Sequence, residues 1–386
     1  MKLTCIYCKT EEFEQGRGSE EHAVLSSLGG RKASKSICCQ KCNTALGNEI
    51  DEPLTEGLRI LSTFLGVVTG RGKDAATLKS YGTHNDKKFD LLPGGRVQQS
   101  KVKIDREIDK ENGVANISVS ARNLEEAKNL LEQQMKSFGK SVKDFKFGEI
   151  TERIEYPESI SGTLDLGLVS QHRSIAKSAL TYIATMISPE RLRSGCFYQI
   201  IEYIVGDIED LELAKMTTVK FPASPHISDA QHRIIISASS ERKIAIGLVE
   251  LFGGLKFKVI LTDCWEGPDL QKGYAVNPLN GEQVEHVDTV NLNNDHWNDE
   301  TSNLNEEEYK DMMCKVFGVA YGHHVRLERE RIISEITQDF CKEYGGKDFT
   351  DELKMMLSSR IAKAIANSIY KVDENRKISQ DEFEIT

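Results

Sequence analysis

Four cysteines near the start of the chain form two pairs, and their spacing constrains the fold more than any other feature of the sequence. The pairs are Cys5/Cys8 and Cys39/Cys42, each with two intervening residues. Such a pair places two thiolates on one tight turn, and two such turns complete a tetrahedral zinc site. A segment of about fifty residues buries too little apolar surface to fold alone, so a metal ion replaces part of its core. The spacing therefore predicts structural zinc rather than four ordinary reduced cysteines.

The loop between the two pairs, residues 9–38, is longer than the roughly 15–20 residues of a simple zinc ribbon. Other elements are therefore inserted there. Glu21-His22 heads an apolar run that ends at Leu25, and Leu28-Gly29-Gly30 turns the chain. We predict a strand, a turn, a returning strand and a helix at residues 21–25, 28–30, 35–38 and from Cys42 onward.

This combination of residues resembles the HNH endonucleases of the ββα-metal superfamily, in their zinc-bound McrA-like branch. The pattern is Cys-x-x-Cys, an acidic residue before His, a Leu-Gly-Gly turn, Cys-x-x-Cys-Asn, then Leu-Gly and Ile-Asp. It covers about the first 54 residues. The resemblance implies metal-dependent hydrolysis of DNA phosphodiester bonds, with products that carry 5′-phosphate and 3′-hydroxyl ends.

The resemblance also assigns roles to four residues. His22 matches the first motif histidine, and Asn43 matches the central asparagine. Asp51 takes the last motif position, where the family usually has His or Asn. Glu21 takes the acidic position before the histidine, which is often Asp. The two departures bear on which divalent metal the site would prefer.

The chemistry of these side chains supports the same assignment. Phosphodiester hydrolysis needs a base that activates water and a cation that offsets charge on the phosphate. His22 is the only histidine in the segment, and its usual pKa of about 6.5 leaves it largely neutral. Glu21 and Asp51 offer hard oxygen ligands, which suit Mg²⁺ or Mn²⁺. Asn43 is expected to brace the catalytic loop through hydrogen bonds to the backbone.

Each assignment has a plainer alternative. A Glu21-His22 pair can also belong to an ordinary polar surface, and Asp51 can end a helix. A basic cluster between the two predicted strands, formed by Arg31, Lys32 and Lys35, is predicted to contact nucleic-acid phosphates. The alternative for this cluster is a solvated loop.

The composition is that of an ordinary globular protein. Nine cysteines, four assigned to zinc and five scattered, form no disulfide framework, which favours a reducing cytoplasm. Among the five, Cys38 is expected to be a small buried residue. Neither a signal peptide nor a membrane span is expected. The net charge of −10 disfavours binding of nucleic acid by the chain alone. Positive charge must therefore be concentrated locally or supplied by a partner.

With 386 residues, the chain is expected to be an α+β protein with three regions. Residues 1–54 form the zinc-bound ββα nuclease domain. Residues 55–165 form a connecting helix and a small α+β unit, and residues 166–386 form a recognition or regulatory region.

The third region has clear periodic patterns. Apolar and alternating runs predict an antiparallel sheet between residues 212 and 290, followed by a polar linker over 291–303. Arg173 and Lys177, four positions apart in a predicted helix, either contact phosphate or lie on a solvated face. Apolar residues at helical spacing predict helices at residues 172–187, 306–344 and 349–372.

We therefore expect a metal-dependent DNA endonuclease that is recruited or activated through its C-terminal body. By resemblance, such chains serve in bacterial anti-phage defence or restriction. The activator would be a partner protein, a guide nucleic acid or a small ligand, and a homo-oligomer is compatible with the sequence. The alternatives are a non-catalytic zinc-bound module that binds nucleic acid or protein, and a nuclease subunit of a guided or signal-activated complex.

Overall fold

The computed structural model describes most of the chain, in eleven stretches. These are residues 1–84, 87–109, 114–139, 151–154, 165–208, 212–222, 225–286, 294–297, 304–346, 348–372 and 374–377. The chain forms two compact units, Met1–Ala76 with Thr163–His324, and Thr77–Gly162 with Val325–Thr386. The division into compact units does not test whether the chain folds as separate domains. The domain boundaries predicted at residues 54 and 165 therefore stay a prediction.

A six-stranded antiparallel sheet forms the base of the first unit. Its strands, in spatial order, are β11 (Ala214–Met216), β14 (Leu255–Thr262), β13 (Ile244–Leu251), β12 (His232–Ser239), β15 (Leu270–Val276) and β16 (Gln283–His286). The antiparallel sheet predicted for this part of the chain is therefore confirmed. The turn between β13 and β14 contains Gly253, whose positive φ of 65° favours glycine.

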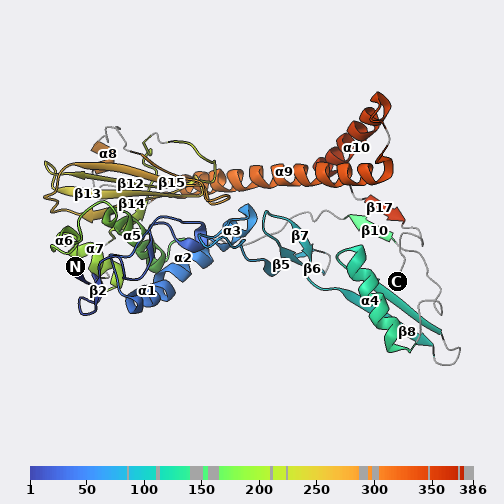
Figure 1. Ribbon diagram of the computed structural model, residues 1–386, viewed down its shortest axis with the longest axis horizontal. Coiled ribbons are helices and arrows are strands. Elements are labelled where there is room, and N and C mark those ends of the chain that lie inside the picture. The colour runs from blue at the N-terminus through green and yellow to red at the C-terminus, as the bar shows by residue number, and fades with distance from the viewer. Residues whose placement is uncertain are drawn as a thin grey trace. The chain divides into compact units, whose positions relative to one another are not determined.

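Helix α5 (Val169–Ala184) packs against both the sheet and the N-terminal segment (Figure 1). Most of its residues are buried, as expected for a helix with neighbours on several sides. Close approach to the sheet depends on small residues, because a Cβ on Gly247 of β13 would lie only 2.7 Å from the Cβ of Ala179. The helix predicted for this stretch is confirmed, and it lies at the centre of the unit.

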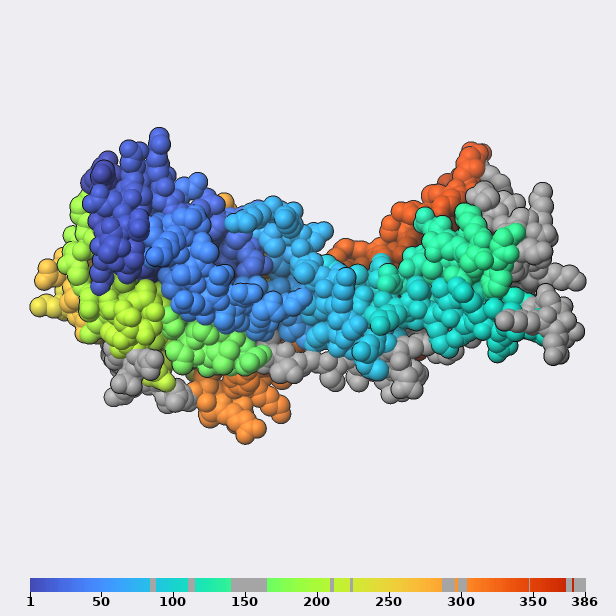
Figure 2. Space-filling model, turned by 90° about the horizontal axis from the view of Figure 1, so that it is seen from below, coloured from blue at the N-terminus to red at the C-terminus, as the bar shows by residue number. Residues whose placement is uncertain are grey.

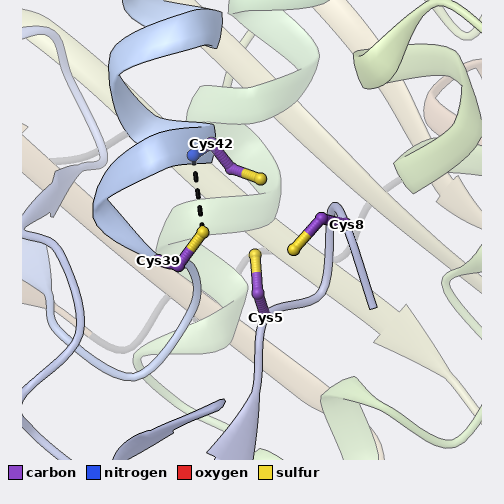
Figure 3. Close-up of side chains that lie close together, drawn as sticks. All are labelled: Cys5, Cys8, Cys39 and Cys42. Atoms are coloured by element: carbon purple, nitrogen blue, oxygen red, sulfur yellow. Dashed lines mark hydrogen bonds between the residues drawn. The ribbon is translucent and has the colours of Figure 1, made fainter. Parts of the chain in front are cut away.

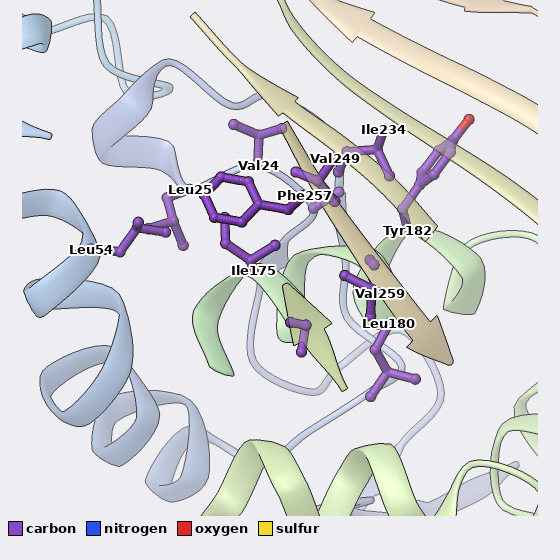
Figure 4. Close-up of a cluster of buried hydrophobic side chains, with 14 of the residues drawn as sticks. Val24, Leu25, Leu54, Ile175, Leu180, Tyr182, Ile234, Val249, Phe257 and Val259 are labelled. Carbon is purple, nitrogen blue, oxygen red and sulfur yellow. The ribbon is translucent and has the colours of Figure 1, made fainter. Parts of the chain in front are cut away.

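The hydrophobic core joins the segment, α5 and the sheet into one body (Figure 4). The labelled contributors are Val24, Leu25 and Leu54 from the segment, Ile175, Leu180 and Tyr182 from α5, and Ile234, Val249, Phe257 and Val259 from the sheet. In Figure 2 the blue atoms of the N-terminal segment lie directly against the green atoms that follow residue 165. The apolar residues of the N-terminal segment thus share one core with the body of the same unit.

Two short hairpins and a run of helices make up the N-terminal segment. The hairpins are β1 (Lys2–Thr4) with β2 (Glu12–Glu14), and β3 (Glu21–His22) with β4 (Ala33–Ser34). The helices are α1 (Gln40–Leu46), the π-helical turn η2 (Gly47–Asp51), α2 (Glu52–Gly57) and α3 (Arg59–Leu65). Strand β3 with β4, followed by α1, reproduces the predicted order of strand, strand and helix.

The predicted position of the returning strand, residues 35–38, is wrong. The chain pairs with β3 two residues earlier, with His22 opposite Ala33. The backbone carbonyls of 35–38 are used elsewhere, because Lys35 O accepts from Gly18 N and Cys38 O accepts from Ser19 N, both at 2.9 Å. Residues 35–38 therefore line the loop that leads into β3, and the Cys38 side chain is fully buried there, as predicted.

Shorter elements complete the first unit. They are η1 (Ser26–Leu28), α6 (Pro189–Leu192), α7 (Tyr198–Val205), α8 (Asn294–Trp297) and the beginning of α9 (Glu306–Tyr344). The predicted polar linker over 291–303 lies outside the described residues except for α8. No helix among the described residues is both long enough and apolar enough to cross a membrane.

The second unit contains small sheets, the helices α4 and α10, and the part of α9 from Val325 onward. The sheets are β5 (Leu78–His84), β6 (Lys87–Leu91) and β7 (Val97–Gln99); β8 (Lys103–Asp109) and β9 (Val114–Ser120); and β10 (Thr151–Ile154) with β17 (Glu374–Lys377). Helix α4 (Leu124–Ser137) is capped by Asn123, whose Oδ1 accepts from Glu126 N at 2.8 Å. Helices α9 and α10 (Asp351–Tyr370) confirm the two predicted C-terminal helices.

Candidate metal centre and active site

The four paired cysteines converge on one point (Figure 3). Cys5 and Cys8 lie on the turn after β1, while Cys39 caps the N-terminus of α1 and Cys42 lies in its first turn. Their sulfur atoms all lie within 4.8 Å of one another. Four thiolates around one centre are the donor set of structural zinc, so these residues fit the predicted ion.

Arg193, between α6 and α7, holds both cysteine turns to the body. Its Nε donates to Thr4 O at 2.7 Å, and its Nη2 donates to Ser36 O at 2.9 Å. One planar guanidinium thus ties the residue before Cys5 to the loop before Cys39. No local sequence signal marks this role, because the partners are more than 150 positions away from Arg193 in the chain.

His22 lies on β3 with its side chain partly exposed. Burial lowers the pKa of the imidazole, and the nearby charges of Glu20 and Arg71 act in opposite directions on it. The lowered pKa keeps His22 neutral at neutral pH, which is the state that a base requires. Arg71 itself is exposed, in the loop that follows α3.

Asn43, in α1, fixes the loop that leads to His22. Its Nδ2 donates to Ser19 Oγ at 2.6 Å and to Glu20 O at 3.1 Å. Ser19 Oγ in turn donates to Gln40 Oε1 at 3.1 Å. The expected hydrogen bond from Asn43 to the backbone is present, so α1 and β3 are held in a defined relation.

Glu21 and Asp51 are brought together, but a lysine lies between them. Lys177 Nζ, from α5, lies 2.6 Å from Glu21 Oε1 and 2.5 Å from Asp51 Oδ2. The Lys177 side chain is 0% exposed and that of Glu21 is 2% exposed. The two carboxylates hold the pKa of Lys177 above its usual value despite the opposing effect of burial, so the ammonium stays charged.

The two remaining carboxylate oxygens also have hydrogen-bond donors. Ser174 Oγ, one turn before Lys177 on α5, donates to Asp51 Oδ1 at 2.6 Å. The Cys38 thiol donates to Glu21 Oε2 at 3.7 Å. All four oxygens of the pair therefore contact a donor, and the binding of a divalent ion by Glu21 and Asp51 stays a prediction.

The predicted phosphate-binding cluster is tied into the protein. Lys32 Nζ lies 2.7 Å from a Glu285 carboxylate oxygen of β16. Arg31 Nη1 donates to Gly70 O at 2.7 Å. Lys35 is the most exposed of the three, in a longer contact of 3.6 Å with Glu20. The contact of these residues with nucleic acid stays a prediction.

Two basic residues of α5, Arg173 and Lys177, have partners within the protein. Arg173 was expected on a solvated face or at phosphate, but it donates two hydrogen bonds to Ile204 O at the end of α7. Lys177 had the same expectation and is fully buried between Glu21 and Asp51. Their helical spacing is confirmed, and the burial of Lys177 depends on partners that are distant in sequence.

Comparison with known proteins identifies the N-terminal segment. Residues 5–59 match the model of a family described as HNH endonuclease. No curated protein and no solved structure matches the chain. The match and the four-cysteine cluster confirm the prediction of an HNH segment at the N-terminus, within a chain of mixed helix and sheet.

Proposed function

We propose that the protein is an HNH endonuclease that hydrolyses phosphodiester bonds of DNA, with His22 as the general base. The observation that carries the proposal is the position of His22 inside the matched segment. It lies partly exposed on β3, at the end of a loop that Asn43 holds to α1. The four-cysteine centre at the start of α1 supports the same arrangement.

In the proposed reaction, neutral His22 takes a proton from a water molecule as that water attacks the phosphorus atom. Its lowered pKa keeps a large share of the imidazole unprotonated at neutral pH. Asn43 acts as a positioning residue, because it holds the Glu20 carbonyl next to the catalytic strand. By resemblance to the family, the products carry 5′-phosphate and 3′-hydroxyl ends.

The negative charge that develops on the phosphate needs a cation. We assign this contact to Arg71, which is exposed and close enough to His22 to influence its pKa. A divalent ion is expected from the family resemblance, where it offsets charge on the phosphate and leaving oxygen. We route no step through such an ion at Glu21 and Asp51, since Lys177 already holds both carboxylates.

We further propose that the body recruits or activates the nuclease site. The chain carries 60 acidic and 50 basic residues, so it repels bulk DNA unless a local basic surface or a partner offsets that charge. A partner protein, a guide nucleic acid or a small ligand would supply the missing attraction. A role in anti-phage defence or restriction is consistent with a nuclease that is silent until it is recruited.

One observation favours a second candidate, a non-catalytic zinc-bound module that binds nucleic acid or protein. The Glu21 and Asp51 carboxylates, which the family resemblance assigns to a catalytic metal, are neutralised in part by Lys177. A segment that kept the zinc frame and lost its catalytic ion would retain a surface for binding without hydrolysis.

A cleavage assay separates the two candidates. The zinc-loaded protein is incubated with supercoiled plasmid in Mg²⁺, in Mn²⁺ and in a metal-free buffer, and His22→Ala is run beside it. Cutting by the wild-type protein and not by His22→Ala supports the nuclease. DNA binding by both proteins without cutting under any condition supports the binding module.

A further inference from the structure

We infer that Lys177 is the resident cation of the Glu21–Asp51 pair, and that these carboxylates therefore do not bind Mg²⁺ or Mn²⁺ in the wild-type protein. The inference rests on the proposed HNH assignment, because the family resemblance gives these two residues to a catalytic divalent ion. The lysine comes from α5, outside the matched segment 5–59.

The first argument is the geometry of the donors. Lys177 Nζ contacts one oxygen of each carboxylate, at 2.6 Å for Glu21 and 2.5 Å for Asp51. The other oxygens accept from Cys38 and Ser174. Each oxygen keeps a second lone pair, but an ion shared by the two carboxylates would have to approach the oxygens that the ammonium already contacts.

The second argument is charge. An ionised Glu21–Asp51 pair carries two negative charges, and the ammonium already compensates one of them. A divalent ion placed at the same oxygens would lie within a few ångströms of the ammonium, and the two cations would repel each other. Lysine and divalent ion are therefore alternatives for this position.

The third argument is the burial of Lys177. Its side chain is 0% exposed, and its neighbours Ile175, Ala176 and Ala179 on α5 are buried in the core. Withdrawal of the ammonium requires α5 to separate from the sheet or from the N-terminal segment. The Lys177 side chain is thus a fixed part of the fold and does not leave the carboxylate pair while α5 stays packed.

The consequence is an internal cross-link. Through one ammonium, α5 joins β3, which carries Glu21, to the turn η2, which ends with Asp51. By resemblance to the family, Glu21 and Asp51 would instead hold a divalent ion. Here the body of the protein supplies the cation, so the segment and the body form one structural unit.

The test measures Mn²⁺ binding, which does not depend on cleavage. Zinc-loaded wild-type protein, Asp51→Asn, Lys177→Met and the double variant Lys177→Met/Asp51→Asn are titrated with Mn²⁺, and free Mn²⁺ is followed by electron paramagnetic resonance. Methionine keeps an unbranched apolar stem and removes the charge. The difference between each protein and its Asp51→Asn partner isolates binding at this pair from weak binding elsewhere.

We expect the wild-type protein and Asp51→Asn to bind the same amount of Mn²⁺. Lys177→Met should gain one Mn²⁺ that the double variant lacks, and its melting temperature should fall by about 10 °C and rise again when Mn²⁺ is added. An Asp51-dependent Mn²⁺ site in the wild-type protein overturns the inference. So does a folded Lys177→Met that binds no more Mn²⁺ than the double variant.

The wild-type comparison decides the matter even when Lys177→Met does not fold. It needs only the wild-type protein and Asp51→Asn, which keeps the shape of the side chain and one hydrogen-bond acceptor. Loss of cutting by His22→Ala concerns the proposed function, and the Mn²⁺ count concerns Lys177. The two proposals can therefore fail separately.

Discussion

His232 of β12 donates a 2.8 Å hydrogen bond from Nε2 to the carbonyl oxygen of Leu28, in the turn of the HNH segment. The other ring nitrogen, Nδ1, accepts a hydrogen bond from Phe252 N at 3.1 Å. In the neutral ring the proton is therefore on Nε2, which makes Nε2 the donor to Leu28 O. The ring is fully buried, and burial lowers its pKa from 6.5 to about 4. A neutral histidine thus links the central sheet to the nuclease segment.

The first prediction concerns acid stability. In the unfolded chain the imidazole of His232 takes up a proton below about pH 6.5, whereas in the folded protein it stays neutral down to about pH 4. Stability from this residue is therefore present above pH 6.5 and is lost as the pH falls from 6.5 to 4, by about 3 kcal/mol. Urea unfolding at several pH values measures it.

The matched variant for this experiment is His232→Gln, which keeps a donor for Leu28 and does not titrate in this range. Its stability should be lower at neutral pH, because Phe252 N loses its acceptor, but should fall less between pH 6.5 and 4. Parallel pH profiles for the two proteins would contradict the prediction. Other groups, including the zinc cysteines, contribute equally to both profiles.

The second prediction concerns zinc. Cys39→Ser should lose the bound ion and unfold the N-terminal segment, because zinc binding supplies much of its folding free energy. The control is Cys38→Ser, at the neighbouring position, whose side chain contacts Glu21 and lies outside the four-sulfur cluster. Elemental analysis should find zinc in the control and in the wild-type protein. If Cys39→Ser keeps its full zinc content and the wild-type melting temperature, Cys39 is not a ligand of a structural zinc ion.

Features with local causes were predictable from the sequence. The zinc cysteines, the turn at Gly29, the helix that contains Cys42 and the apolar or alternating runs of β12 to β14 each follow from spacing within a few residues. The surroundings of Glu21 and Asp51 could not be predicted from the sequence. They depend on Lys177, which lies 156 positions from Glu21 and 126 positions from Asp51 along the chain. An apolar helix with one lysine gives no signal about which buried charges that lysine meets.

The misplaced strand has a similar cause. Residues 35–38 do not pair with β3, and Ile37 O instead accepts a hydrogen bond from Ile6 N at 3.2 Å. The sequence shows that such a segment can be extended. It does not show which of several nearby backbones accepts its hydrogen bonds.

The third prediction concerns the base. His22→Ala should reduce plasmid cutting by roughly two to four orders of magnitude and leave the fold and DNA binding intact, because the residue is partly exposed and its loss leaves no large cavity. His226→Ala is the control, since His226 is an exposed histidine that pairs with Asp229 away from the site. Equal cutting rates for His22→Ala and the wild-type protein would exclude His22 as the base.

The fourth prediction concerns Arg71. Removal of its charge in Arg71→Ala should raise the pKa of His22, because the guanidinium disfavours the imidazolium. The acidic limb of the pH–rate profile should then move to higher pH, and the rate at neutral pH should fall through the lost phosphate contact. Arg17→Ala, which removes the same charge from an exposed pair with Glu14, should change neither. An unshifted profile in Arg71→Ala would show that Arg71 does not act on His22.

The fifth prediction concerns DNA binding by the isolated chain. The net charge of −10 opposes association with DNA, and each phosphate contact made by a local basic residue adds a counterion-release contribution to the affinity. We expect weak binding whose logarithm falls steeply with the logarithm of salt concentration, measured by fluorescence anisotropy of a labelled duplex. One active site cuts one strand at a time, so nicked circles should appear before linear plasmid. Tight binding at physiological salt, with rapid unaided degradation of plasmid by the monomer, would show that no recruitment or activation is needed.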